Sequence, residues 1–108
     1  MKTKLLAVLL LLASNNALAA TQQCAEEAIN QAGKLLSFHS NGDDRAKADS
    51  TVKALPSISN PVDKSQKFLV LEVMGYIYKG TYRMRLIYYP SGNECVLMGQ
   101  EILELAKL

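Results

Sequence analysis

The sequence has few of the side chains that usually carry metal or acid–base chemistry. It contains one histidine, two cysteines without a C-x-x-C spacing, and none of the motifs G-x-x-x-x-G-K-[ST], G-x-G-x-x-G, H-E-x-x-H or G-x-S-x-G. A zinc site needs about four nitrogen, sulfur or carboxylate ligands, and the phosphate-binding and hydrolytic motifs depend on their own spacing. We therefore expect no metal, no cofactor and no catalytic residue, and we interpret the protein as a non-enzyme.

The single histidine, His39, gives one alternative to this interpretation. It is followed by Ser40, Asp43 and Asp44, which together with it offer the residue types of a hydrolytic triad. Neighbours on one loop rarely reach the required geometry, because triads are normally assembled from distant parts of a chain. A histidine at a helix end, favoured there by the helix dipole, is the structural interpretation, and a weak hydrolase centred on His39 is the enzymatic one.

The chain also lacks an apolar run of the length that spans a bilayer. Its longest run, Leu5 to Ala13, follows Lys2 and Lys4 and precedes the small-residue stretch Ala17-Leu18-Ala19. A spanning helix needs about 20 apolar residues, whereas these three parts are typical of a secretory signal peptide. We expect cleavage before Ala20, so that 1–19 is the signal peptide and 20–108 is one domain without a transmembrane segment. The domain is then periplasmic or secreted.

A surplus of cations is missing as well. Loss of Lys2 and Lys4 with the signal peptide leaves ten basic residues from the original twelve, against ten acidic residues. Nucleic-acid binding relies on excess cations that displace counterions from phosphates. We therefore expect no nucleic-acid partner.

The two cysteines, Cys24 and Cys95, allow one internal pairing. Export would deliver them to an oxidising compartment, where such pairs form disulfides. The bridge would close a loop of about 70 residues, which the chain-entropy model credits with roughly 4 kcal/mol. We predict a structural Cys24–Cys95 disulfide.

The stretch from Thr21 to Phe38 has the period of an α-helix. Its apolar residues recur at intervals of three and four, at Ala25, Ala28, Ile29, Ala32, Leu35 and Leu36. Thr21 is the expected N-cap. The stripe is mostly alanine in its first half, which lets the helix lie close to whatever it packs against.

A polar connector, 39–49, separates this helix from the rest of the chain. Thr51 to Leu55 could be a short strand, placed at a sheet edge because Pro56 follows it. From Lys67 onward apolar residues alternate with mixed ones, which indicates antiparallel strands. Lys79-Gly80 is the expected two-residue turn, since glycine tolerates the positive φ of tight hairpins.

This turn fixes the expected strand pairing. It pairs Gly75 with Met84, Val73 with Leu86 and Leu71 with Tyr88, and a second turn at 90–93 pairs Tyr88 with Cys95. Cys95 then lies on the apolar face, which a helix bound to Cys24 must cover. We predict an α+β fold in which the N-terminal helix packs on a three- to four-stranded antiparallel β-meander and is tied to it by one disulfide. The tail, 101–108, is expected to be a short helix or a strand extension, with helix preferred because Glu101 would otherwise point into the core.

The other face of the sheet is the candidate binding site. Tyr82 and Tyr88 belong to the core face, whereas the pairing places Met74 beside Arg85 and Tyr76 beside Arg83 on the opposite face. Tyrosine, methionine and arginine are enriched at protein interfaces. There are two alternatives to a binding site: this face is ordinary solvent-exposed sheet, or the C-terminal segment folds back and covers it. The candidate binding residues are Met74, Tyr76, Tyr78, Arg83 and Arg85.

The sequence thus favours a small exported protein-binding module, such as an inhibitor, an immunity-type protein or an envelope accessory protein. Another protein is the expected partner. A carrier of a small apolar or amphipathic ligand, held between helix and sheet, is the alternative from a different functional class. The sequence does not indicate the oligomeric state.

Overall fold

The computed structural model describes residues 21–107 of the chain. The predicted signal peptide, 1–19, lies outside the described residues, as does its cleavage site before Ala20. In chain order the elements are helix α1 (Ala25–His39) and strands β2 (Ala46–Ala48), β3 (Lys53–Ser59), β4 (Lys67–Ile77), β5 (Gly80–Ser91) and β6 (Glu94–Lys107). All strand pairs are antiparallel. The predicted α+β fold is confirmed.

Helix α1 begins later than expected and ends one residue further on. The N-cap is Cys24, with φ of 65° and no side-chain hydrogen bond, so Thr21 is not the cap. At the other end, the N–H of Asn41 donates to the carbonyl of Phe38 and the N–H of Gly42 donates to that of Ser37. Asn41 has a positive φ of 56°. This Schellman arrangement satisfies the last carbonyls and ends the helix.

The sheet is a meander whose first strand is interrupted. Its order is β2-β4-β5-β6, and β3 also pairs with β4. Strand β2 lies along the end of β4 (75–77) and β3 along its beginning (67–72), so both occupy the same edge. The interruption turns the expected three or four strands into five, and it places β2 inside the stretch 39–49 that the sequence indicates as a connector.

The β4–β5 hairpin has the predicted faces but a register shifted by two residues. Gly75 pairs with Tyr82, Leu71 with Leu86, and Ile77 with Gly80. The turn is therefore Tyr78-Lys79 rather than Lys79-Gly80, and Tyr78 has a φ of 53°. A Cβ on Gly80 would lie 2.9 Å from Cε1 of Tyr82. Gly80 thus makes room for an aromatic ring within the ladder instead of supplying a positive φ.

The tail is strand, and the preference for a C-terminal helix is wrong. In β6 the pairing with β5 runs from Tyr88–Leu97 to Ile87–Gly99, so Met98 is an extra residue. This β-bulge changes which face the following residues point to. Glu101 consequently pairs with Arg85 on the face away from the helix, while Ile102 pairs with Met84. The reason for preferring a helix, a glutamate pointing into the core, is removed by the bulge.

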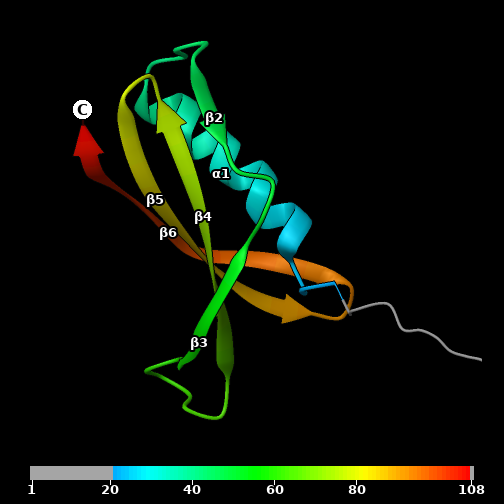
Figure 1. Cartoon of the computed structure of the whole chain (residues 1–108). Coiled ribbons are helices and arrows are strands. Elements are labelled where there is room, and N and C mark those ends of the chain that lie inside the picture. Colours follow the sequence, from blue (N-terminus) through cyan, green and yellow to red (C-terminus); the bar gives the residue numbers. More distant parts are fainter. Residues whose placement is uncertain (1–20, 108) are drawn as a thin grey trace, which may run out of the picture.

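The core lies between α1 and one face of β4 and β5. Ala28, Ala32 and Leu36 of the helix are almost fully buried. They pack with six buried residues of the sheet, namely Leu71, Val73, Tyr82, Met84, Leu86 and Tyr88. The predicted core positions of Tyr82 and Tyr88 are confirmed. Figure 1 shows α1 alongside one part of the sheet, with β3 and the start of β4 extending beyond the helix at the other end.

A disulfide joins Cys24 to Cys95, as predicted, with the two Cα atoms 5.8 Å apart. It links the residue that begins α1 to the second residue of β6. The small alanine side chains let the helix backbone approach the sheet closely, which suits a helix fastened at its first turn. The bridge therefore fixes the helix at the end where its own apolar contacts are smallest.

Candidate functional site

The face of the sheet turned away from α1, here called the open face, is the candidate site. It consists of the residues that alternate with the core residues along β4, β5 and β6. In the described part of the chain α1 is the one helix, and it lies on the other face. The C-terminal segment extends the sheet as β6 and does not fold back over the open face. The exposed and half-buried residues of the open face are Glu72, Met74, Tyr76, Arg83, Arg85, Ile87, Tyr89, Glu94, Val96, Glu101 and Leu103, while Val70, which pairs with Ile87 on the same face, is buried.

A network of charges occupies the middle of this face. The Nε–H of Arg85 donates a hydrogen bond of 3.2 Å to Oε1 of Glu72, whose side chain is 13% exposed. Nε of Arg83 lies 3.9 Å from the same oxygen, and Nη2 of Arg83 lies 3.9 Å from Oε2 of Glu101. These longer distances give charge attraction without hydrogen bonds. Glu72 therefore holds two guanidinium groups side by side on the sheet.

Arg83 is the incompletely satisfied member of the network. Its Nε is buried and has no hydrogen-bond partner among the described residues. Its side chain as a whole is 25% exposed. A half-buried guanidinium with unused N–H groups can donate a further hydrogen bond to a partner's carboxylate or backbone carbonyl.

Apolar side chains surround the charges. Tyr76, Val96 and Leu103 are each 40–47% exposed, and Met74 and Ile87 are half-buried. The surface is therefore a mixture of fixed charges and accessible apolar groups. This composition is typical of protein interfaces, in which tyrosine, methionine and arginine are enriched.

Two lysines from the opposite edge extend the open face. Lys47 of β2 pairs with Tyr76, and Lys53 of β3 pairs with Glu72, and directly paired residues share a face. With Arg83 and Arg85 they give four cations against the three carboxylates Glu72, Glu94 and Glu101. The open face of the described residues thus has a positive balance, although the sequence predicts a nearly neutral domain.

The structure brings four of the five predicted site residues together. Met74 pairs directly with Arg83, and Arg85 pairs with Glu72 in the next row. The predicted pairs Met74–Arg85 and Tyr76–Arg83 are wrong by two positions, because of the shifted turn. Tyr76 lies one row further along, opposite Thr81.

Tyr78 is separated from the others. It lies in the β4–β5 turn, where its ring is 4.8 Å from the Arg45 guanidinium and 5.4 Å from the Lys79 ammonium. These distances are within the range of cation–π contacts. Tyr78 therefore packs with the loop that follows α1 and is not part of the open face.

Glu101 and Leu103 are open-face residues that the sequence reasoning did not find. The preference for a C-terminal helix kept them out of the sheet. Gly99 was the available signal, since glycine within a strand often marks a bulge.

The residues around His39 are engaged in local contacts. The ring of His39 lies edge-on to Tyr82, with centroids 5.4 Å apart. The hydroxyl of Ser40 donates to the carbonyl of Ser37 and accepts from the N–H of Asp43. The Asp43 carboxylate is bound by Arg45, which lowers the pKa of Asp43 to about 2. In this arrangement neither Ser40 nor Asp43 is hydrogen-bonded to His39.

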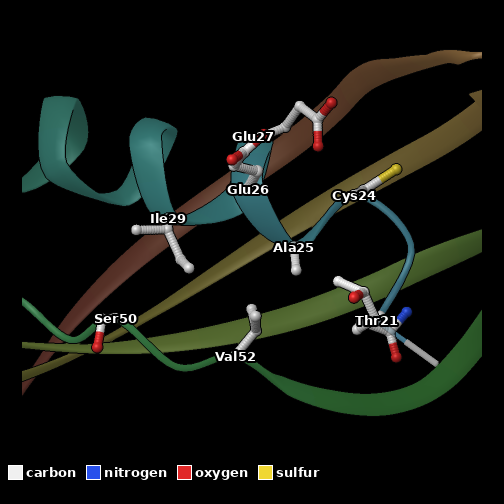
Figure 2. Close-up of a pocket in the computed structure, with 9 residues that line it drawn as sticks. Thr21, Cys24, Ala25, Glu26, Glu27, Ile29, Ser50 and Val52 are labelled. Carbon is white, nitrogen blue, oxygen red and sulfur yellow. The ribbon is translucent and has the colours of Figure 1, made fainter. Parts of the chain in front are cut away.

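A hollow of about 450 Å³ lies beside the first turns of α1. Figure 2 shows Ala25 and Ile29 of the helix facing Ser50 and Val52 of the segment between β2 and β3, while Glu26 and Glu27 point away. The hollow is at the rim of the helix–sheet interface rather than inside it, because the interface itself is filled by the core residues. A ligand there would contact a partly apolar groove that is open to solvent.

The fold and the site define a small disulfide-bonded α+β protein in which, among residues 21–107, a helix covers one sheet face and none covers the other. The chain matches no protein-family model, and searches of curated proteins and of solved structures find no match either. Across 21–107, no helix is long and apolar enough to cross a membrane. The same residues contain no cluster of three or more histidine, cysteine, aspartate or glutamate side chains that could hold a metal ion.

Proposed function

We propose that the protein is an exported binding module that recognises another protein through the open face of its sheet. Inhibitors, immunity-type proteins and envelope accessory proteins are kinds of small exported protein that bind another protein. The observation that carries the proposal is the combination of accessible apolar side chains with arginines fixed by Glu72 on a face that no other described element covers.

The fixed arginines favour binding for a physical reason. A partner that contacts a long side chain normally has to immobilise it, which costs about 0.5–1.5 kcal/mol for each side chain ordered. Arg83 and Arg85 are already held over the sheet by Glu72, so part of this ordering is complete before binding. Tyr76, Val96 and Leu103 supply the apolar area around them.

Export is the second part of the proposal. It rests on the three-part signal sequence of 1–19. The Cys24–Cys95 disulfide is compatible with the oxidising compartment to which such a signal directs a protein.

Site-specific photocrosslinking in cells that naturally produce the protein would test the binding face. A photoreactive amino acid is placed at Tyr76 or Leu103 on the open face, and at Phe38 or Val62 as controls. The controls are more exposed than the open-face positions, at 85% and 93%, and they lie on α1 and on the β3–β4 loop. We expect both open-face positions, and neither control, to form the same adduct with another protein.

Substitutions then measure the contribution of single residues. Tyr76→Ala and Arg83→Ala should weaken the binding of the partner found by crosslinking about tenfold or more, a loss typical of residues that dominate an interface. Phe38→Ala should leave it unchanged. If Tyr76→Ala and Arg83→Ala both fold and bind as the wild type does, the open face is not the binding surface.

The hollow beside α1 supports a second candidate function, a carrier of a small amphipathic ligand. Its volume of about 450 Å³ is in the range of small-molecule sites. Mass spectrometry of protein purified under native conditions would reveal a retained ligand. Val52→Trp, which would fill the hollow, should abolish that retention, and protein that carries no ligand would argue against a carrier.

A further inference from the structure

The two edges of the sheet differ in how accessible they are to another strand. The edge formed by β2 and β3 is interrupted between Ala48 and Lys53, and its pairing with β4 is irregular again around Pro56. Proline and lysine on a broken strand are devices that prevent a further strand from adding to a sheet. This edge is protected.

The edge formed by β6 has few such protections. The strand comprises 14 residues without a proline, and in the described fold it pairs with β5 alone. About half of its backbone N–H and C=O groups therefore point away from the sheet. The β5–β6 pairing is irregular at Met98 and again at Leu105. Between them, from Gly99 to Glu104, it is regular, so this part of the free edge has regular strand geometry.

Exposed apolar side chains are concentrated on the same strand. Leu97, Met98 and Leu105 are 37–50% exposed, as are Val96 and Leu103 of the open face. A long, exposed and apolar edge strand is a template for pairing with another chain. In an exported protein such an edge is expected to be covered by a partner.

The charges on β6 indicate the chemistry of that partner. The strand carries three glutamates, Glu94, Glu101 and Glu104, and its one cation is Lys107 at the end. Glu101 already attracts Arg83 from β5, and its side chain is still 56% exposed. A strand on the free side would meet an acidic edge, so a basic strand is favoured. Two copies of β6 would instead bring their glutamates together.

We propose that the free edge of β6 accepts an extended apolar and basic segment of another protein, which adds to the sheet as a sixth strand. This inference rests on the proposed function in assuming that the protein binds another protein, and it specifies a binding mode and a partner chemistry. Its surface, the β6 edge, adjoins the open face and shares Val96, Glu101 and Leu103 with it, whereas Tyr76 on β4 belongs to the open face alone.

A peptide that copies β5, residues 80–91, is the probe. This segment already forms an antiparallel ladder with β6, and it carries arginines at the level of Glu101. The control peptide has the same sequence with Arg83→Glu and Arg85→Glu. Fluorescence anisotropy with labelled peptides should show binding of the β5 peptide about tenfold tighter than that of the control, from two charge pairs worth up to about a factor of five each.

Variants of the protein locate the binding. Glu101→Lys should reverse the preference, so that the control peptide binds more tightly than the β5 peptide. Val96→Lys with Leu103→Lys should abolish binding of the β5 peptide, because lysines on the exposed strand obstruct a neighbouring strand and repel its arginines. Tyr76→Ala should leave peptide binding unchanged. Circular dichroism and melting temperature confirm that each variant is folded.

Other outcomes would contradict the β6-edge proposal, and the crosslinking result separates it from the proposed function. If the wild type binds neither peptide, or if Glu101→Lys does not change the preference, β6 does not accept a basic strand. If light scattering shows a dimer that Val96→Lys with Leu103→Lys converts to a monomer, the occupant of the edge is a second copy. In either case open-face crosslinks at Tyr76 would still support the proposed function, whereas peptide binding without such crosslinks would support the edge alone.

Discussion

Removal of the Cys24–Cys95 disulfide is expected to destabilise the protein strongly. The bridge joins residues 71 apart in the sequence. In the chain-entropy model a loop of this length restricts the unfolded chain by about 4 kcal/mol at 25 °C. A domain of this size has a total stability of roughly 5–15 kcal/mol. The bridge therefore supplies a large share of the free energy of unfolding.

The magnitude can be expressed as a change in melting temperature. For a domain of 60–100 residues, about 1 kcal/mol corresponds to a change of roughly 4–8 °C. Loss of the bridge should thus lower the melting temperature by about 15–30 °C. The apolar contacts of Ala28 and Ala32 cannot compensate for this loss, because alanine side chains bury little apolar area even when they are fully buried.

Urea unfolding in the presence and absence of a reducing agent measures this effect. We expect reductant to lower the urea midpoint of the wild type. The variant Cys24→Ala with Cys95→Ala should have this low midpoint both with and without reductant. The variant is the control for any effect of the reductant on other groups. Native-state hydrogen exchange should show that the first turns of α1, which follow Cys24, lose most protection.

One result would refute the reasoning. If reductant demonstrably breaks the bridge, shown by two free thiols, and the midpoint of the wild type does not move, the disulfide does not stabilise the fold through the unfolded chain. The packing of the alanine face of α1 against the sheet would then have to be sufficient by itself.

Three further predictions concern single residues. Gly75→Ala should destabilise the protein by about 1–3 kcal/mol in urea unfolding, because a Cβ there would lie 2.7–3.0 Å from buried side-chain atoms. Glu72→Gln should lower the free energy of unfolding by roughly 1–3 kcal/mol, since it leaves two half-buried guanidinium groups without their carboxylate, whereas Glu101→Gln should change it by less than about 0.5 kcal/mol. Arg45→Gln should raise the pKa of Asp43 from about 2 towards its ordinary 3.8, as measured by NMR titration. The Asp43 pKa is lowered in the folded state, so its contribution to stability is present above the ordinary value and is lost as the pH falls from about 4 towards 2.

The fold could be predicted from the sequence where side-chain alternation and covalent chemistry agree. The alanine stripe of α1 and the alternation along β4 and β5 each define one buried face. The bond between Cys24 and Cys95 requires the start of the helix to lie near that face. These three signals are independent of the exact strand register, and the fold class they predict is confirmed.

The register itself could not be obtained in the same way. A shift of two residues leaves every side chain on its face, so the apolar pattern is equally satisfied by the turn at Lys79-Gly80 and by the turn at Tyr78-Lys79. The choice depends on Gly80, which accommodates the ring of Tyr82 in the ladder, and on a positive φ at a tyrosine. Neither is a common sequence signal.

The candidate site shows the same division. Alternation alone placed Met74, Tyr76, Arg83 and Arg85 on one face, whereas the pairs they form depend on the register. The charge network was missed for this reason, because the predicted register puts Glu72 beside Ile87 and the actual one puts it beside Arg85.

The bulge at Met98 connects these observations to the proposed function. Without the extra residue, β6 would continue with Glu101 and Leu103 on the helix side and Ile102 on the open face. With it, Ile102 joins the edge of the core, and Glu101 reaches Arg83 across the open face. The strand continues beyond the bulge to Lys107, which gives the long free edge. One residue therefore determines that Glu101 and Leu103, which lie on this edge strand, belong to the open face.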